Sequence, residues 1–194
     1  VYPLSQHIGA PAVPIVKRGD RVLVGQKIAE AGGFVSANIH SSISGTVKMI
    51  EPRMTNGGNK VNSIVIENDG LFETIDFSEN VRDLSTLYRE DIKDMIKEAG
   101  IVGMGGAGFP TCVKLKPAKP VDTILLNGCE CEPYLTADHK VLLEFADDII
   151  FGLKAILKTT GAEKGIIVIE DNKPDAIESV SYTHLRAHET RRHL

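Results

Sequence analysis

Two short segments hold the residue types best able to do chemistry: a glycine-rich run at 103–111 and an acidic run at 127–133. The first reads Gly-Met-Gly-Gly-Ala-Gly-Phe-Pro-Thr and the second Asn-Gly-Cys-Glu-Cys-Glu-Pro. In the first, backbone N–H groups can approach a phosphate because four residues carry no Cβ: Gly103, Gly105, Gly106 and Gly108. The second supplies the groups that could orient a flavin or a ribose: Asn127, Glu130 and Glu132. Together the two runs predict a nucleotide-cofactor site.

The glycine-rich run follows a helical pattern, which departs from the strand, loop and helix order of the dinucleotide fingerprint. A purely structural turn is therefore the alternative. Pro110 and Thr111 are typical of a helix start, where unpaired N–H groups attract anions. Lys114, one turn further on, could reach a bound phosphate; the alternative is an ordinary solvated lysine.

Glu130 and Glu132 flank Cys131, and in an extended segment their side chains would point the same way. Two carboxylates that face one cleft repel each other, which raises the pKa of one of them unless a partner compensates. The hydroxyls of a ribose would be such a partner. Two exposed loop acids are the alternative.

Cysteines and histidines form no recognisable metal site in the sequence. Cys129, Cys131 and His139 lack the spacing of zinc or iron–sulfur ligands, so no metal ligand is predicted. Cys131 is expected to pack as a small apolar residue instead. Three cysteines in all argue against a disulfide framework and favour a reducing compartment. His7 and His40 are assigned structural roles by default.

Composition sets the broad class. A chain of 194 residues with 42% hydrophobic and 25% charged residues is typical of a globular protein with one ordinary domain or two small ones. No apolar run is long enough to cross a bilayer. The formal net charge of −4 argues against non-specific nucleic-acid binding.

The first 70 residues predict an all-β domain. Short apolar runs separated by glycine-containing turns favour a small closed β structure, with strands at 22–24, 27–29, 45–50 and 63–67. Residues 71–84 are acidic and irregular and are predicted to be a connector.

From residue 85 to 180 the pattern predicts an α/β domain. A helix is expected from an N-cap at Ser85 to Gly100, and a long helical stretch at 136–160, in one or two pieces, before Gly161. Apolar runs at 122–126 and 165–169 predict buried strands, and Pro174 starts a further helix. Strand, helix and strand make a βαβ unit with a parallel sheet, whose ligands bind beyond the carboxyl ends of the strands. Asn127 to Glu132 fall at that place.

The last residues differ in style from the rest. Residues 183–194 hold three of the six histidines and three arginines, so 181–194 is expected to be a non-native tail outside the fold. A histidine-rich metal-binding tail is the alternative. The chain starts at Val1 without Met and is expected to be a fragment at both ends.

Residues 16–28 and 42–47 resemble the biotinyl/lipoyl barrel-sandwich family. Carrier members hold a lysine about eleven residues before the glycine of the Ser-Gly-Thr motif, where this chain has Phe34; the nearest lysine is Lys27. The resemblance therefore implies the fold without the carrier chemistry. The expected fold class is α/β, with an N-terminal barrel-sandwich hybrid followed by a βαβ-containing domain of FMN/NADH-binding type.

Three motifs, at 4–12, 100–115 and 127–139, resemble the C subunit of the Rnf ion-translocating electron-transport complex and, more distantly, the flavin- and NADH-binding subunit of respiratory complex I. The resemblance implies that the four loop glycines line an FMN and NADH pocket and that Lys114 lies near the flavin phosphate. It implies that Asn127 and Glu130 face the flavin and that Glu132 approaches the dinucleotide. Relative to complex I, the sequence departs from the pattern at Met104, Cys112 and Cys129.

The resemblance also implies a function. Family members transfer electrons between ferredoxin and NAD, coupled to ion transport, with FMN and NADH as cofactors and [4Fe–4S] clusters in a cysteine-rich segment that this chain lacks. The expected partners are other Rnf-type membrane subunits and ferredoxin-linked electron carriers, with no nucleic acid, at the cytoplasmic face of the membrane. No acid–base catalyst is predicted. The alternatives are a flavin-dependent cobalamin reductase of the Rnf-C-like type and a non-catalytic assembly module.

Overall fold

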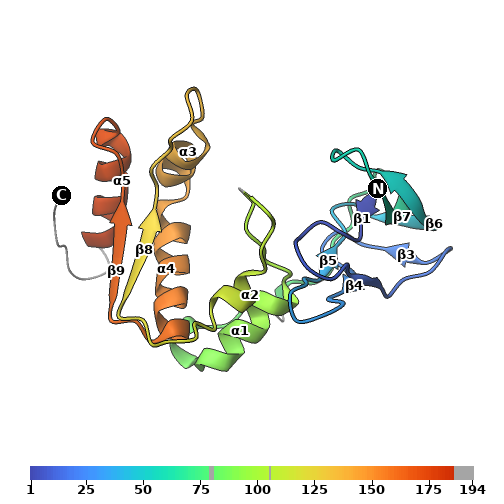
Figure 1. Cartoon of the computed structure of the whole chain (residues 1–194), viewed down its shortest axis with the longest axis horizontal. Coiled ribbons are helices and arrows are strands. Elements are labelled where there is room, and N and C mark those ends of the chain that lie inside the picture. Colours follow the sequence, from blue (N-terminus) through green and yellow to red (C-terminus); the bar gives the residue numbers. More distant parts are fainter. Residues whose placement is uncertain (79–80, 105, 186–194) are drawn as a thin grey trace. The chain divides into compact units, whose positions relative to one another are not determined.

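The computed structural model describes residues 1–78, 81–104 and 106–185 of the chain (Figure 1). The chain forms two compact units, the first spanning Val1–Lys116 and the second beginning at Pro117. The domain boundaries predicted from sequence, near 70 and 85, remain a prediction. The two compact units meet elsewhere, between Lys116 and Pro117.

The first unit contains two antiparallel sheets. The four-stranded sheet has the order β1-β7-β6-β3, and the three-stranded sheet has the order β2-β4-β5. The strands of the first are β1 (Tyr2–Pro3), β7 (Lys60–Asn68), β6 (Gly45–Met54) and β3 (Arg21–Val22). Those of the second are β2 (Val13–Pro14), β4 (Lys27–Glu30) and β5 (Ile39–His40).

One apolar core joins the two sheets. Its side chains come from both of them, and the most completely buried are Val22, Ile28, Val47 and Ile64. The four strands predicted from alternating apolar runs are present in shifted or extended form as β3, β4, β6 and β7. The two-residue strands β1, β2 and β5 were not predicted, because a period of two residues needs a longer run to show itself.

The predicted connector at 71–84 lies within the first unit and pairs there with Val24. The N–H of Val24 donates to Glu73 O at 2.8 Å, and the N–H of Ile75 donates to Val24 O at 3.0 Å. The segment thus runs parallel to Val24, and the ring of Phe77 lies against Gly25. A short 3₁₀ helix, η2 (Leu84–Thr86), follows.

Helix α1 (Arg89–Glu98) starts later than predicted. The N-cap position is Tyr88, whose N–H donates to the Asp91 carboxylate at 2.8 Å, so the expected cap at Ser85 is wrong. Gly100 ends the helix with a φ of 66°, as predicted. The C-terminal turn of α1 is tied to the β sheets: Glu98 forms an ion pair with Lys27, and Asn38 Nδ2 donates to Glu98 O at 3.2 Å.

The second unit is the predicted βαβ arrangement. Strands β8 (Thr123–Asn127) and β9 (Lys164–Val168) pair in parallel. Helices α3 (Ala137–Glu144) and α4 (Ala146–Thr160) connect them, and α5 (Pro174–Leu185) follows. Gly161 ends α4 with a φ of 78°, which confirms the predicted terminator. The expected non-native tail begins inside α5, and residues 186–194 lie outside the described residues.

Helices α3, α4 and α5 pack on one face of this sheet (Figure 1). The core residues of the helices, against which Ile167 of β9 packs, are Leu142, Ala146, Ile150, Ala176 and Val180. The opposite face is open: Leu125 is 65% exposed and its β9 partner Ile166 is 46% exposed. The prediction that both strands are buried is therefore wrong for one face of the sheet.

Candidate functional site

The glycine-rich loop (residues 103–109) is the closed end of a small hairpin. Val102 and Pro110 form an antiparallel bridge, and the N–H of Gly103 donates to Phe109 O at 3.0 Å. Met104 is 97% exposed, so the side of the loop that it occupies faces solvent. Gly105 lies outside the described residues. Beyond the hydrogen-bonded stem, the described residues Met104 and Gly106 are both exposed, so this part of the loop faces solvent.

The three described glycines of the loop differ in how much space a side chain would find. A Cβ built on Gly106 would meet nothing within 4 Å, and one on Gly103 would approach only Phe109, at 3.9 Å. Gly108 has a φ of 65°, and a Cβ there would lie 2.9 Å from Gln6 O. The fold therefore requires glycine at 108, while it leaves free space at 103 and 106.

Lys114 lies in the last turn of α2 (Thr111–Lys114), the single helical turn that follows the loop. This confirms the short helix predicted there. The Lys114 side chain is exposed, so its ammonium group is accessible to an anion from solvent. Cys112, one of three free thiols, is half-buried on the same turn.

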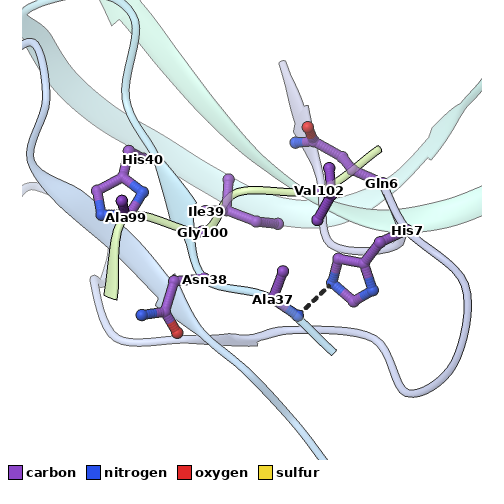
Figure 2. A pocket seen from close by; sticks show the side chains of 9 residues that line it. All are labelled: Gln6, His7, Ala37, Asn38, Ile39, His40, Ala99, Gly100 and Val102. Atoms are coloured by element: carbon purple, nitrogen blue, oxygen red, sulfur yellow. Dashed lines mark hydrogen bonds between the residues drawn. The ribbon is translucent and has the colours of Figure 1, made fainter. Parts of the chain in front are cut away.

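A hollow of about 240 Å³ adjoins the stem of the glycine-rich loop (Figure 2). One wall is formed by Ala99, Gly100 and Val102, another by β5 and residues 37–38, and Gln6 and His7 line one end. Burial lowers the pKa of His40 at the opposite end, an effect that nearby Glu98 opposes and Lys27 supports. The His40 imidazole is therefore favoured in its neutral form.

Asn127 and Gly128 lie at the carboxyl end of β8, as predicted. The Asn127 side-chain oxygen accepts a hydrogen bond from the N–H of Cys129 at 3.1 Å and so shapes the turn that leaves the strand. Beside them is an open hollow of about 290 Å³ whose other walls are mainly apolar side chains of α3 and α4. This end of the sheet combines a polar rim with an apolar floor.

Glu130 is the most deeply placed acid of the predicted site, with a side chain only 1% exposed. Its Oε2 lies 2.6 Å from Lys173 Nζ, and its Oε1 accepts from the N–H of Asp138, at the start of α3, at 2.7 Å. The hydrogen bond from Lys173 lowers the pKa of Glu130 most; burial opposes it, and the N–H of Asp138 lowers it further. Glu130 is therefore an ionised carboxylate with both oxygens engaged.

Glu132 differs from Glu130 in being exposed. The two carboxylates do not face one cleft, so the predicted same-side arrangement is wrong. The reason is local: residues 129–131 lie beyond the backbone hydrogen bonds that join the end of β8 to β9, and Glu130 turns inward to Lys173. Cys131 is also exposed, so the expectation that it packs as an apolar residue is wrong. Cys129 is half-buried, with its Sγ 3.9 Å from Val168 O.

The predicted site residues divide between the two units. Gly103, Gly106, Gly108 and Lys114 belong to the first, and Asn127, Glu130 and Glu132 to the second. Their joint role at one nucleotide remains a prediction. Sequence reasoning missed Lys173, because its contact with Glu130 spans 43 residues and leaves no local pattern in the sequence. Within the described ranges, no cluster of three or more His, Cys, Asp or Glu residues could hold a metal ion, and no helix has the length and apolar character needed to span a membrane.

Comparison with known proteins identifies two families along the chain. Residues 1–71 match the RnfC barrel sandwich hybrid domain, and residues 96–192 match the Nuo51 FMN-binding domain. The second match covers both the glycine-rich loop and the acidic segment that follows β8. The departures at Met104, Cys112 and Cys129 do not prevent it.

Curated relatives are similar over most of this chain. It is 52% identical over 185 residues to the C subunit of the Na⁺-translocating ferredoxin:NAD⁺ oxidoreductase complex of Acetobacterium woodii, covering 93% of this chain and 41% of that protein. It is 48% identical over 180 residues to the C subunit of the proton-translocating ferredoxin:NAD⁺ oxidoreductase complex of Clostridium ljungdahlii, covering 92% of this chain and 39% of that protein. The C subunit of the ion-translocating oxidoreductase complex of Pseudomonas aeruginosa is 41% identical over 186 residues, covering 93% of this chain and 24% of that protein.

The chain spans about two fifths or less of the length of these relatives. Both family matches, at residues 1–71 and 96–192, lie within that span. The chain therefore belongs to the RnfC family, the C subunits of Rnf-type ion-translocating oxidoreductase complexes.

Proposed function

We propose that the chain is the part of an RnfC-type protein that binds FMN and receives NADH, in a complex that transfers electrons between ferredoxin and NAD and couples this to ion transport. The observation that carries the proposal is the Nuo51 FMN-binding match over 96–192, which contains both predicted binding segments. The relatives' names supply the reaction and the complex. The partners would be the other subunits of that complex and ferredoxin-linked carriers, at the cytoplasmic face of the membrane.

The residues present fit an FMN phosphate at the glycine-rich loop. Gly103 and Gly106 leave open space where a side chain would otherwise stand, and Lys114 offers an exposed cation one turn beyond the loop. A phosphate needs close backbone N–H groups and a positive charge. The N–H of Gly103 already donates to Phe109 O, so Gly106 would offer the open backbone and Lys114 the charge. Bound FMN would supply the redox chemistry, and the protein would contribute binding and orientation.

The residues after β8, taken by themselves, fit a flat ring. Asn127 and Gly128 border an apolar hollow, which suits a flat ring with a polar edge. Glu130 would act through its fixed neighbours, because both its oxygens are already bonded. The exposed Glu132 would be the carboxylate that accepts hydrogen bonds from the dinucleotide. In the first unit, we propose that the two sheets have the barrel-sandwich arrangement of the matched family.

The test is a titration of FMN into the purified protein, followed by flavin fluorescence, with NADH added afterwards. Gly106→Ala should weaken FMN binding about tenfold, equivalent to roughly 1.4 kcal/mol, because a methyl group would stand where the phosphate approaches. Its thermal midpoint should not change, since the new Cβ meets nothing within 4 Å. Gly57→Ala is the matched control: a Cβ there would have its nearest neighbour at 3.9 Å, in the hairpin between β6 and β7.

Two further variants separate the cofactors. Lys114→Gln should weaken FMN binding, and Glu132→Gln should weaken NADH binding while leaving FMN unaffected. Wild-type protein that binds neither nucleotide would reject the proposal and favour an assembly module. FMN binding that is equally strong in wild type, Gly106→Ala and Lys114→Gln would reject the assignment of the phosphate to this loop.

A further inference from the structure

The N-terminal loop (residues 5–12) and the glycine-rich loop touch through their backbones. The N–H of Ile8 donates to Ala107 O at 2.9 Å. Gly108 lies so close that a Cβ there would be 2.9 Å from Gln6 O and 3.0 Å from His7 Cα. Two segments far apart in sequence are therefore in contact, and we call this contact, between residues 6–8 and residues 107–108, the joint. The predicted binding loop packs on the N-terminal loop there.

His7 fixes the N-terminal side of this joint. It is only 8% exposed, and its Nε2 accepts a hydrogen bond from the N–H of Ala37 at 3.1 Å (Figure 2). Because Nε2 is the acceptor, the proton of the neutral ring lies on Nδ1, which is 3.1 Å from Ile8 O and donates to it. The His7 imidazole thus links Ala37 to Ile8, and the N–H of Ile8 holds Ala107.

The rest of the N-terminal loop is seated on the same segment. The N–H of Ala10 donates to Val35 O at 2.9 Å, and a Cβ on Gly9 would lie only 2.1 Å from that oxygen. The N-terminal loop is therefore held against residues 35–37 by hydrogen bonds. Ile8, which belongs to that loop, in turn holds Ala107 through its N–H. A Cβ on Gly106, the neighbour of Ala107, would meet nothing within 4 Å.

We propose that His7 is a positioning residue for the glycine-rich loop, holding its backbone N–H groups in the arrangement that an FMN phosphate requires. The inference rests on the proposed function. Its physical basis is that a loop already ordered before binding loses less conformational entropy when the ligand arrives. The β sheets, which have no carrier lysine at Phe34, would then serve as the support of the flavin-binding loop.

The test compares His7→Ala with Ser44→Ala in the full chain, by amide hydrogen exchange without FMN and by FMN titration. Ser44 is fully buried in the same unit, but its hydroxyl bonds to Asp69 and to the N–H of Glu73, not to the joint. His7→Ala should speed exchange at the Ile8 and Gly103 amides and weaken FMN binding on the order of tenfold. Ser44→Ala should lower the thermal midpoint yet leave both readouts at their wild-type values.

Conservative variants sharpen the result. His7→Gln can still accept from Ala37, and His7→Asn can still donate to Ile8 O, so each should recover part of the FMN affinity lost in His7→Ala. Equal exchange of the loop amides in His7→Ala and Ser44→Ala would overturn the proposal. If wild-type protein binds no FMN, the proposed function fails, and faster exchange in His7→Ala would then assign His7 a structural role only.

Discussion

At the scale of single residues, Glu130 connects three elements. It follows β8, it accepts a hydrogen bond from the first turn of α3, and it pairs with Lys173 immediately before α5. Lys173 also lies 2.9 Å from Glu170, so its ammonium group is shared by two carboxylates. A buried carboxylate with such partners organises the turn from which Glu132 projects.

The ionised form of Glu130 should contribute stability that depends on pH. Its pKa in the folded protein is lowered from 4.5, so the contribution is complete above that value and is lost as pH falls through the lower, folded pKa. Glu130→Gln should therefore lower the thermal midpoint by several degrees at pH 7, and by progressively less below pH 4.5. Thermal unfolding of both proteins across this range measures the difference.

Glu132→Gln is the matched control for this prediction, because the same substitution two residues away affects an exposed side chain. Its midpoint should follow that of the wild type at every pH. A Glu130→Gln deficit that did not change with pH, or that Glu132→Gln reproduced, would contradict the assignment. The sequence pointed to Glu130 through its position after a strand. It could not reveal Lys173, because a contact across 43 residues leaves no local pattern.

At the scale of elements, the long patterns were readable, whereas the two-residue strands β1, β2 and β5 and the 3₁₀ helix were not. The α3–α4 pair, its glycine terminator and the parallel strands followed from apolar periodicity and Gly161. The start of α1 did not, because its N-cap is Tyr88, a residue type that is not preferred at that position, and the Tyr88 N–H is held by the Asp91 carboxylate. The solvent exposure of one face of the β8–β9 sheet could not be predicted either, since an apolar run in the sequence does not show which face of the strand is covered.

A Leu→Ala substitution should cost very different amounts of stability on the two sides of the β8–β9 sheet. Leu142 on α3 is 2% exposed within the helical core, so Leu142→Ala should cost about 2–5 kcal/mol. Leu125 on the open face is 65% exposed, so Leu125→Ala should change stability by no more than about 0.5 kcal/mol. Chemical denaturation of the two variants measures both values. Similar losses in the two would mean that Leu125 is covered in solution.

At the scale of the whole molecule, two cores without shared residues divide the chain. One joins the antiparallel sheets, and the other joins α3, α4 and α5 to β9. Helix α1 and the glycine-rich loop belong with the first, although the Nuo51 FMN-binding match that includes the loop begins at residue 96. Family boundaries follow ancestry and compact units follow contacts, so a sequence that reveals the former need not reveal the latter.

Two separate cores predict two unfolding transitions that single substitutions can move independently. Gly100 has a φ of 66°, and a Cβ there would lie 2.3 Å from Asn38 O, so Gly100→Ala should destabilise the first unit by at least about 1–2 kcal/mol. Leu142→Ala should lower the transition of the second unit instead. Hydrogen exchange resolved along the chain would assign each transition: Gly100→Ala should raise exchange before Lys116, and Leu142→Ala after Pro117. If either substitution raised exchange equally in both units, the chain would unfold as one cooperative body. A substitution in the first unit could then not change the stability of the glycine-rich loop without also changing that of the second unit.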